Sequence, residues 1–218
     1  MTTEGALNQP LESSHVRTTL LHVAWLAILI GFVLEALLLL LSWGFGTFKS
    51  GKPFIADLVQ KVSWSVIVCV GLALGATAAR ARDVLMGIMG LLAAPLAFSV
   101  ARAMHKGATE ALSVAADLSA GPSPFLIALI KGLEYGLLGF ALSAVQKRSW
   151  GGALAHTVIG VAVGIVFGGT IIFLSMQAAA GPIPHLALAA RAVNEILFPV
   201  GCSLVIFSSE VLGKQISK

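Results

Sequence analysis

Residues 20–41 decide the fold, and they read LLHVAWLAILIGFVLEALLLLL. This stretch holds one carboxylate, Glu35, and one imidazole, His22, among side chains that are otherwise uncharged. At about 1.5 Å of rise per residue, a helix of this length spans the hydrocarbon core of a bilayer, which is roughly 30 Å thick. The stretch therefore predicts a transmembrane helix.

The composition of the whole chain agrees with this prediction. Of its 218 residues, 57% are hydrophobic and only 11% are charged, and the mean hydropathy is +0.94. Soluble domains are about 45–50% apolar and about 25% charged, so much of this chain must face lipid. Apolar stretches separated by Gly, Pro and basic residues predict five further spans, at residues 58–79, 84–103, 124–145, 154–177 and 184–208.

The predicted fold is therefore an all-α integral membrane protein with six transmembrane helices. We expect residues 1–16 to form a mobile polar tail, residues 17–213 to form the transmembrane domain, and residues 214–218 to form a C-terminal tail. With six spans, both tails lie on one side of the membrane. That side carries more basic residues, which predicts cytoplasmic termini in a bacterial inner membrane, although Lys61 and Arg102 near the outer helix ends oppose this bias.

Turns with glycine and proline precede the second, fourth and sixth predicted helices, and they read SGKPF at 50–54, GPSPF at 121–125 and GPIPH at 181–185. Proline suits the first turn of a helix because its missing N–H has no partner there. The recurrence predicts three tandem hairpins, at 18–79, 81–145 and 149–208. The alternative is that apolar helices built from few residue types match by chance. The positions that the repeat makes equivalent are Gln60, Lys131 and Arg191, followed by Trp64, Tyr135 and Glu195.

Ionisable residues inside the predicted helices are candidate functional residues, because a charge in hydrocarbon is unfavourable unless it is paired or hydrated. Lys131 and Glu134 lie at i,i+3, and Arg191 and Glu195 lie at i,i+4, so each pair shares one helix face. We expect two separate ion pairs that line a transport path together with Glu35. Removing either glutamate would then leave a buried cation uncompensated.

Glu35 has no basic partner within its own helix. Protonation would neutralise it and make it a candidate proton carrier. Pairing with Lys61 or Arg102, which lie toward the same side of the membrane, would neutralise it equally well. The sequence leaves both alternatives open.

The remaining motifs favour packing over chemistry. Gly160, Gly164 and Gly168 form a small-xxx-small stripe that allows another helix to approach closely, and no phosphate-binding fingerprint occurs. The two cysteines, Cys69 and Cys202, lie in apolar stretches without metal or redox spacing, so we interpret them as packing residues. His22 and His156 have no second ligand at i+3 or i+4 on their own helices, so they do not predict a metal site. We interpret the four tryptophans, among them Trp64, as anchors at the membrane interfaces.

Two functions remain. The first is a transporter or channel for an ion or small polar solute, and the second is a non-catalytic membrane subunit or scaffold whose glycine stripe meets a partner protein. An enzyme is the class with the least support, because no nucleophile with its base and no hydrolase spacing of carboxylates stands out. We expect the lipid bilayer as the main partner, a homo- or hetero-oligomer as one possibility, no cofactor, no metal and no nucleic acid.

Overall fold

The computed structural model describes residues 9–45, 51–77, 82–114 and 121–216. In these residues the chain is all-helical, and six helical spans are long and apolar enough to cross a membrane, as predicted. The first four spans are α1 (Gln9–Gly44), α2 (Lys52–Ala76), α3 (Arg82–Ala111) and α4 (Pro124–Gln146). The fifth span consists of α5 (Ala153–Val163), the π-helix η2 (Gly164–Gly168) and α6 (Gly169–Ala178), and the sixth is α7 (His185–Ile216).

Several helices are longer than the hydrophobic stretches that predict them. Residues 9–16, expected to belong to a mobile tail, are helical and continue α1, whereas residues 1–8 lie outside the described part. The second helix begins at Lys52, because Pro53 takes a place in its first turn and Gly51 before it adopts a φ of 108°, which favours glycine. In α3 the helix continues to Ala111, beyond the predicted span, which ends at residue 103.

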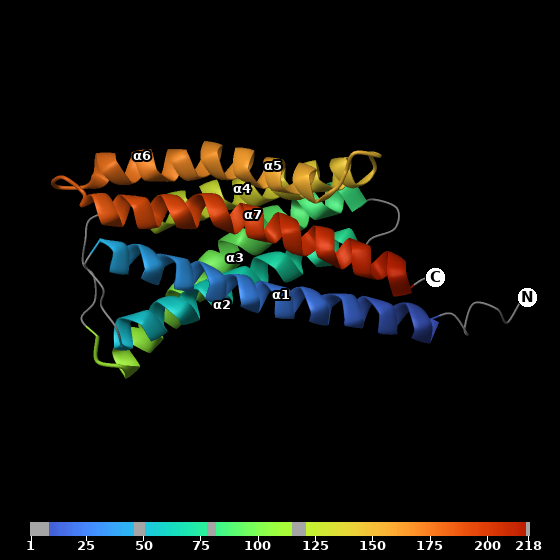
Figure 1. Cartoon of the computed structure of the whole chain (residues 1–218), viewed down its shortest axis with the longest axis horizontal. Helices are drawn as coiled ribbons and strands as arrows, with labels where there is room; N and C mark the ends of the chain where they lie inside the picture. Colours follow the sequence, from blue (N-terminus) through green and yellow to red (C-terminus); the bar gives the residue numbers. More distant parts are fainter. Residues whose placement is uncertain (1–8, 46–50, 78–81, 115–120, 217–218) are drawn as a thin grey trace, which may run out of the picture.

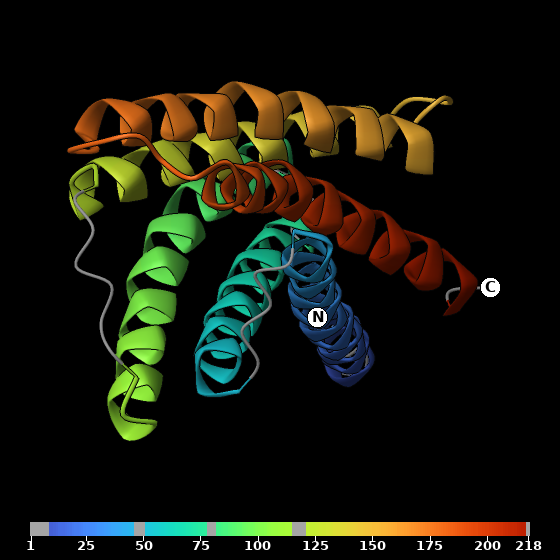
Figure 2. The same cartoon turned by 60° about the vertical axis from the view of Figure 1, so that its left-hand side comes forward.

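The helices form a ring in the order of the sequence. Each span packs against the next one, and α7 returns to pack along α1, while α2, α4 and α7 also contact one another across the middle (Figures 1 and 2). Figure 1 shows that the start of α1 and the end of α7 lie at the same end of the bundle. We call this the terminal end. The opposite end, where α1, α3 and α6 finish and α2, α4 and α7 begin, is the cavity end.

Small residues let neighbouring helices approach closely. A Cβ atom added to Gly90 of α3 would lie 2.1 Å from the carbonyl oxygen of Tyr135 in α4, so no other residue fits there without moving the backbone. The buried hydrophobic side chains are mostly Ala, Val, Leu and Ile, together with Trp64, Tyr135 and Phe198 in the middle of the ring. The large hydrophobic side chains exposed on the outside of the helices are those that a bilayer would cover.

Candidate functional site

Buried charged side chains gather at one level of the bundle. Lys61 lies nine residues into α2, Lys131 seven residues into α4 and Glu195 ten residues into α7, and Glu35 lies nine residues before the end of α1. At about 1.5 Å per residue, all four lie about 10–15 Å inside the helix ends at the cavity end. Four of the six spans therefore contribute a charge to the same layer.

Glu35 and Lys61 form an ion pair between α1 and α2. Their side chains are only 6% and 11% exposed, so the pair is held largely out of solvent. Of the alternatives that the sequence leaves open for Glu35, the structure thus shows pairing with Lys61. Arg102 on α3 is exposed.

Lys131 has two carboxylate partners. Its Nζ atom lies 2.8 Å from Oε2 of Glu134 on its own helix and 2.5 Å from Oε2 of Glu195 on α7. The side chain of Glu134 is fully buried, whereas that of Glu195 is 16% exposed. We call these three residues the Lys131 triad. With both carboxylates ionised it carries a net charge of −1, because one cation faces two anions.

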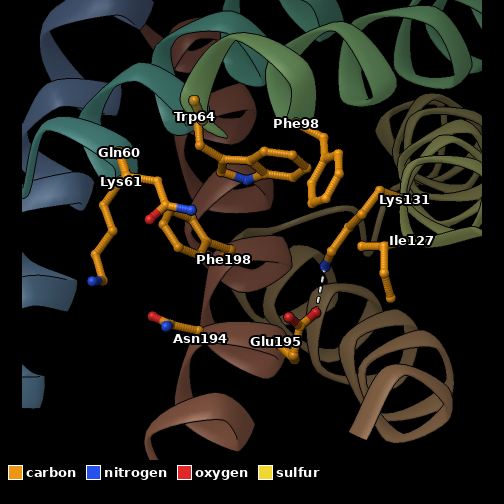
Figure 3. A pocket seen from close by; sticks show the side chains of 10 residues that line it. Gln60, Lys61, Trp64, Phe98, Ile127, Lys131, Asn194, Glu195 and Phe198 are labelled. Carbon is orange, nitrogen blue, oxygen red and sulfur yellow. Dashed lines mark hydrogen bonds and ion pairs between the residues drawn. The ribbon is translucent and has the colours of Figure 1, made fainter. Parts of the chain in front are cut away.

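A cavity of about 160 Å³ lies beside the triad (Figure 3). A water molecule occupies about 30 Å³ in the liquid, so the cavity has room for several waters or one small solute. Figure 3 shows Lys131 and Glu195 facing each other on one side, with Asn194 beside Glu195. The Oδ1 atom of Asn194 is buried and accepts no hydrogen bond from the described residues. The lining residues come from α2, α3, α4 and α7, and they are Gln60, Lys61, Trp64, Phe98, Ala101, Ile127, Lys131, Asn194, Glu195 and Phe198.

Three aromatic rings pack together toward the middle of the bundle, and two of them, Trp64 and Phe198, line the cavity. Trp64 packs edge to face against Tyr135 and Phe198, with ring centroids 5.7 Å and 6.5 Å apart. Each ring lies about one turn further from the cavity end than Lys61, Lys131 or Glu195 on the same helix. The ammonium group of Lys131 also lies 5.7 Å from the Trp64 ring centroid, within range of a cation–π interaction. Trp64, Tyr135 and Phe198 form what we call the aromatic cluster.

The structure brings together most, but not all, of the residues predicted to line a path. Glu134, Lys131 and Glu195 meet in the triad, and Glu35 lies in the same layer. Arg191 does not pair with Glu195 in the described structure: it is exposed, about one turn nearer the cavity end, and Glu195 is bonded to Lys131 instead. Instead of the expected second pair of Arg191 with Glu195, Lys131 pairs with a carboxylate on its own helix and with one on α7.

The glycine stripe of the fifth span faces α7. A Cβ atom added to Gly160 would lie 2.7 Å from Cα of Val200, and one added to Gly168 would lie 2.6 Å from Cβ of Glu195. At Gly164 the same atom would lie 2.9 Å from Cα of Ile196. The π-helix that contains Gly164 and Gly168 thus lies directly against the part of α7 that carries Glu195. Such single π-turns occur frequently at functional sites.

Sequence reasoning missed part of the site. The interpretation of Trp64 as an interfacial anchor is wrong, because its side chain is only 8% exposed and belongs to the core. The other three tryptophans, Trp25, Trp43 and Trp150, are 65–73% exposed. Phe98, Asn194 and Phe198 also line the cavity without any motif to mark them. The predicted repeat gave a signal for Trp64, which it makes equivalent to Tyr135, the ring that Trp64 contacts, and for Gln60, which it makes equivalent to Lys131.

Comparison of the chain with protein-family models, with curated proteins and with solved structures finds no match. The site itself is therefore the basis for a functional proposal.

Proposed function

We propose that this protein is a membrane transporter or channel for an ion or small polar solute, and that the cavity at the cavity end is a binding site on the path. The observation that carries the proposal is a buried lysine with two carboxylates at the wall of a cavity between four spans. Ionisable groups at membrane depth typically mark paths for ions, protons or solutes.

The charge of the Lys131 triad narrows the class of solute. A structural ion pair is neutral, but this cluster has one carboxylate more than it has cations. A cation in the cavity, or a proton on one carboxyl group, would balance the excess. Glu195 is the more accessible of the two carboxylates and lines the cavity, so it is the residue that would meet a cation or exchange a proton.

The orientation and the repeat belong to the same proposal. We place the cavity end on the outer side of a bacterial inner membrane and both termini in the cytoplasm, because the segments between and beyond the helices hold more basic residues at the terminal end than at the cavity end. In a chain with three equivalent hairpins, the second, fourth and sixth spans would line the path, and these are α2, α4 and α7. The contacts among these three helices and the meeting of Trp64 with Tyr135 support that arrangement.

A scaffold is the second candidate, and the bond between Lys131 and Glu195 is the observation that favours it, because it ties α4 to α7. A buried ion network of this kind can serve to specify helix packing. The glycine stripe gives this candidate less support than the sequence suggests, since α7 of the same chain covers it.

A flux assay with Glu195→Gln tests the proposal. The purified protein is reconstituted in phospholipid vesicles, and uptake of Na⁺, uptake of K⁺ and proton movement reported by a trapped pH-sensitive dye are measured. We expect wild-type vesicles to pass at least one of these ions and Glu195→Gln to lose most of that flux while it assembles at near-normal yield. The matched control is Glu110→Gln, because the only ion pair of Glu110 among the described residues is an exposed one with Lys106, 3.8 Å apart.

The outcomes separate the two candidates. Normal flux in a well-folded Glu195→Gln variant would overturn a role for Glu195 in translocation. A variant that assembles poorly, although Lys131 keeps Glu134 as its counter-charge, would favour the scaffold, because the loss then comes from the missing link between α4 and α7.

A further inference from the structure

Two cysteines from distant parts of the chain meet just beyond the aromatic cluster. Cys69 follows Trp64 by five residues in α2, and Cys202 follows Phe198 by four residues in α7. The two sulfur atoms are 3.0 Å apart, and the thiol of Cys69 donates a hydrogen bond to Cys202. Both residues are fully buried and both are free thiols. The interpretation of each as an isolated packing residue thus leaves out the contact between them.

We propose that Cys69 and Cys202 are a redox modification site, a dithiol that converts reversibly into a disulfide and links α2 to α7. A disulfide has a sulfur–sulfur distance of about 2.05 Å, so the two atoms need to approach by only about 1 Å. Each sulfur is already the hydrogen-bonding partner of the other. The second thiol is thus in place to react as soon as the first is oxidised.

The chemistry requires a small uncharged oxidant, because charged reagents do not enter the hydrocarbon layer. Hydrogen peroxide fits. One thiol is oxidised to a sulfenic acid and one water leaves, then the second thiol attacks the sulfenic sulfur, the S–S bond forms and a second water leaves. In total the two thiols lose two electrons and two protons, and the peroxide is reduced to two waters. A permeant dithiol such as dithiothreitol reverses the reaction by thiol–disulfide exchange.

Burial affects the rate of the first step. Thiols in apolar surroundings react more slowly than exposed thiolates, so we expect oxidation over minutes to hours rather than seconds. The direct contact favours the disulfide over further oxidation, because the resolving thiol meets the sulfenic acid before a second peroxide does.

The position of the pair gives the disulfide a consequence for the cavity. The contact between α2 and α7 is much less extensive than those that α2 makes with α1 and α3, so a covalent bond would strengthen a weak junction. Trp64 and Phe198, on the same two helices, close the cavity about one turn away. Resting on the proposed transport function, we expect the disulfide to hold this closure shut and to lower flux.

The test uses the full-length protein in phospholipid vesicles, treated with hydrogen peroxide, then denatured and alkylated with N-ethylmaleimide. By intact mass, the untreated protein should carry two added maleimides. The oxidised protein should carry none and should be two hydrogens lighter than the unlabelled dithiol, and dithiothreitol should restore both thiols. Digestion without reductant should yield one linked peptide pair that contains Cys69 and Cys202. The variants Cys69→Ala and Cys202→Ala should each form no linked peptide pair under the same treatment, because their remaining thiol can be oxidised to a sulfenic acid but has no second thiol to resolve it.

Two results would overturn the site. One is a wild-type protein that keeps both thiols after peroxide treatment. The other is a wild-type protein that loses its thiols without yielding the linked peptide pair of Cys69 and Cys202, which would mean that each cysteine oxidises independently.

Flux is measured on the same vesicles before and after oxidation. A disulfide that forms without changing an existing flux would overturn its action on the cavity. A disulfide that forms in vesicles without any ion flux would instead count against the proposed function and leave the modification site supported.

Discussion

Lys131 of α4 and Glu195 of α7 are joined across the helix interface, with Nζ 2.5 Å from Oε2. Because Lys131 also holds Glu134, the removal of either carboxylate leaves the lysine with one partner. This differs from two isolated pairs, in which each glutamate would be the sole counter-charge of its cation. Removal of either glutamate therefore leaves a neutral pair, and not the uncompensated buried cation that the sequence predicts.

We expect Lys131→Met to be the most destabilising change in the triad. It leaves two buried carboxylates without a cation, and breaking a buried ion pair in this way typically lowers the free energy of unfolding by about 3–5 kcal/mol. Glu134→Gln leaves a neutral pair of Lys131 and Glu195 and should have a clearly smaller effect. Thermal unfolding in detergent measures both, and equal losses in the two variants would contradict the shared lysine.

Glu35→Gln should behave differently from Glu134→Gln. Lys61 is the only cation paired with Glu35 in the described residues, so the substitution leaves that lysine buried without a carboxylate partner. We expect a loss of about 3–5 kcal/mol, comparable to that of Lys131→Met. The exchanged pair Glu35→Lys with Lys61→Glu should recover much of the stability. Failure of that recovery, with both proteins expressed at equal levels, would argue against a direct pair.

The fifth span offers a matched glycine comparison. A leucine at Gly164 must displace the backbone of α7, because even a Cβ atom would lie 2.9 Å from Cα of Ile196. Gly169 has open space around its Cα, so Gly169→Leu is the control. We expect Gly164→Leu to lower the free energy of unfolding by about 1–3 kcal/mol or to prevent assembly, and Gly169→Leu to leave it nearly unchanged. Thermal unfolding and assembly yield check this, and equal effects would show that the close approach is not required.

The proposed orientation predicts that Lys52 and Arg148 face opposite sides of the membrane. Single cysteines placed at these exposed positions, in a chain without Cys69 and Cys202, should react with a membrane-impermeant maleimide from opposite sides of intact cells and inverted vesicles. We choose Lys52 and not the neighbouring Gly51, because Gly51 has a φ of 108°, a conformation that a cysteine would rarely adopt. Labelling of both cysteines from one side would overturn the six-span topology.

The parts of the fold that depend on local sequence could be predicted. Span number followed from hydropathy, and the contact between Lys131 and Glu134 followed from i,i+3 spacing, because both are properties of a single helix. Helix ends were less predictable, since a helix can continue beyond the hydrocarbon, as α1 does through residues 9–16.

The parts of the site that depend on packing between helices could not be predicted. Glu195 lies 64 residues from Lys131, and Cys202 lies 133 residues from Cys69, so no spacing rule relates them. Trp64 shows the same limit, because an amphipathic ring near a helix end suits an interface and a core equally well. Arg191 and Glu195 share a spacing that permits a pair, but a stronger partner on another helix decides where the carboxylate goes.

The two ion clusters also differ in when they can form during synthesis of the chain. Glu35 and Lys61 lie on consecutive helices, so the first hairpin can enter the bilayer with its charges already neutralised. Lys131 enters with the fourth span, whereas Glu195 follows only with the last. Until then Glu134, one turn away on the same helix, is the counter-ion that α4 brings with it. The second carboxylate of the triad thus lets the fourth helix insert before its partner helix has been made.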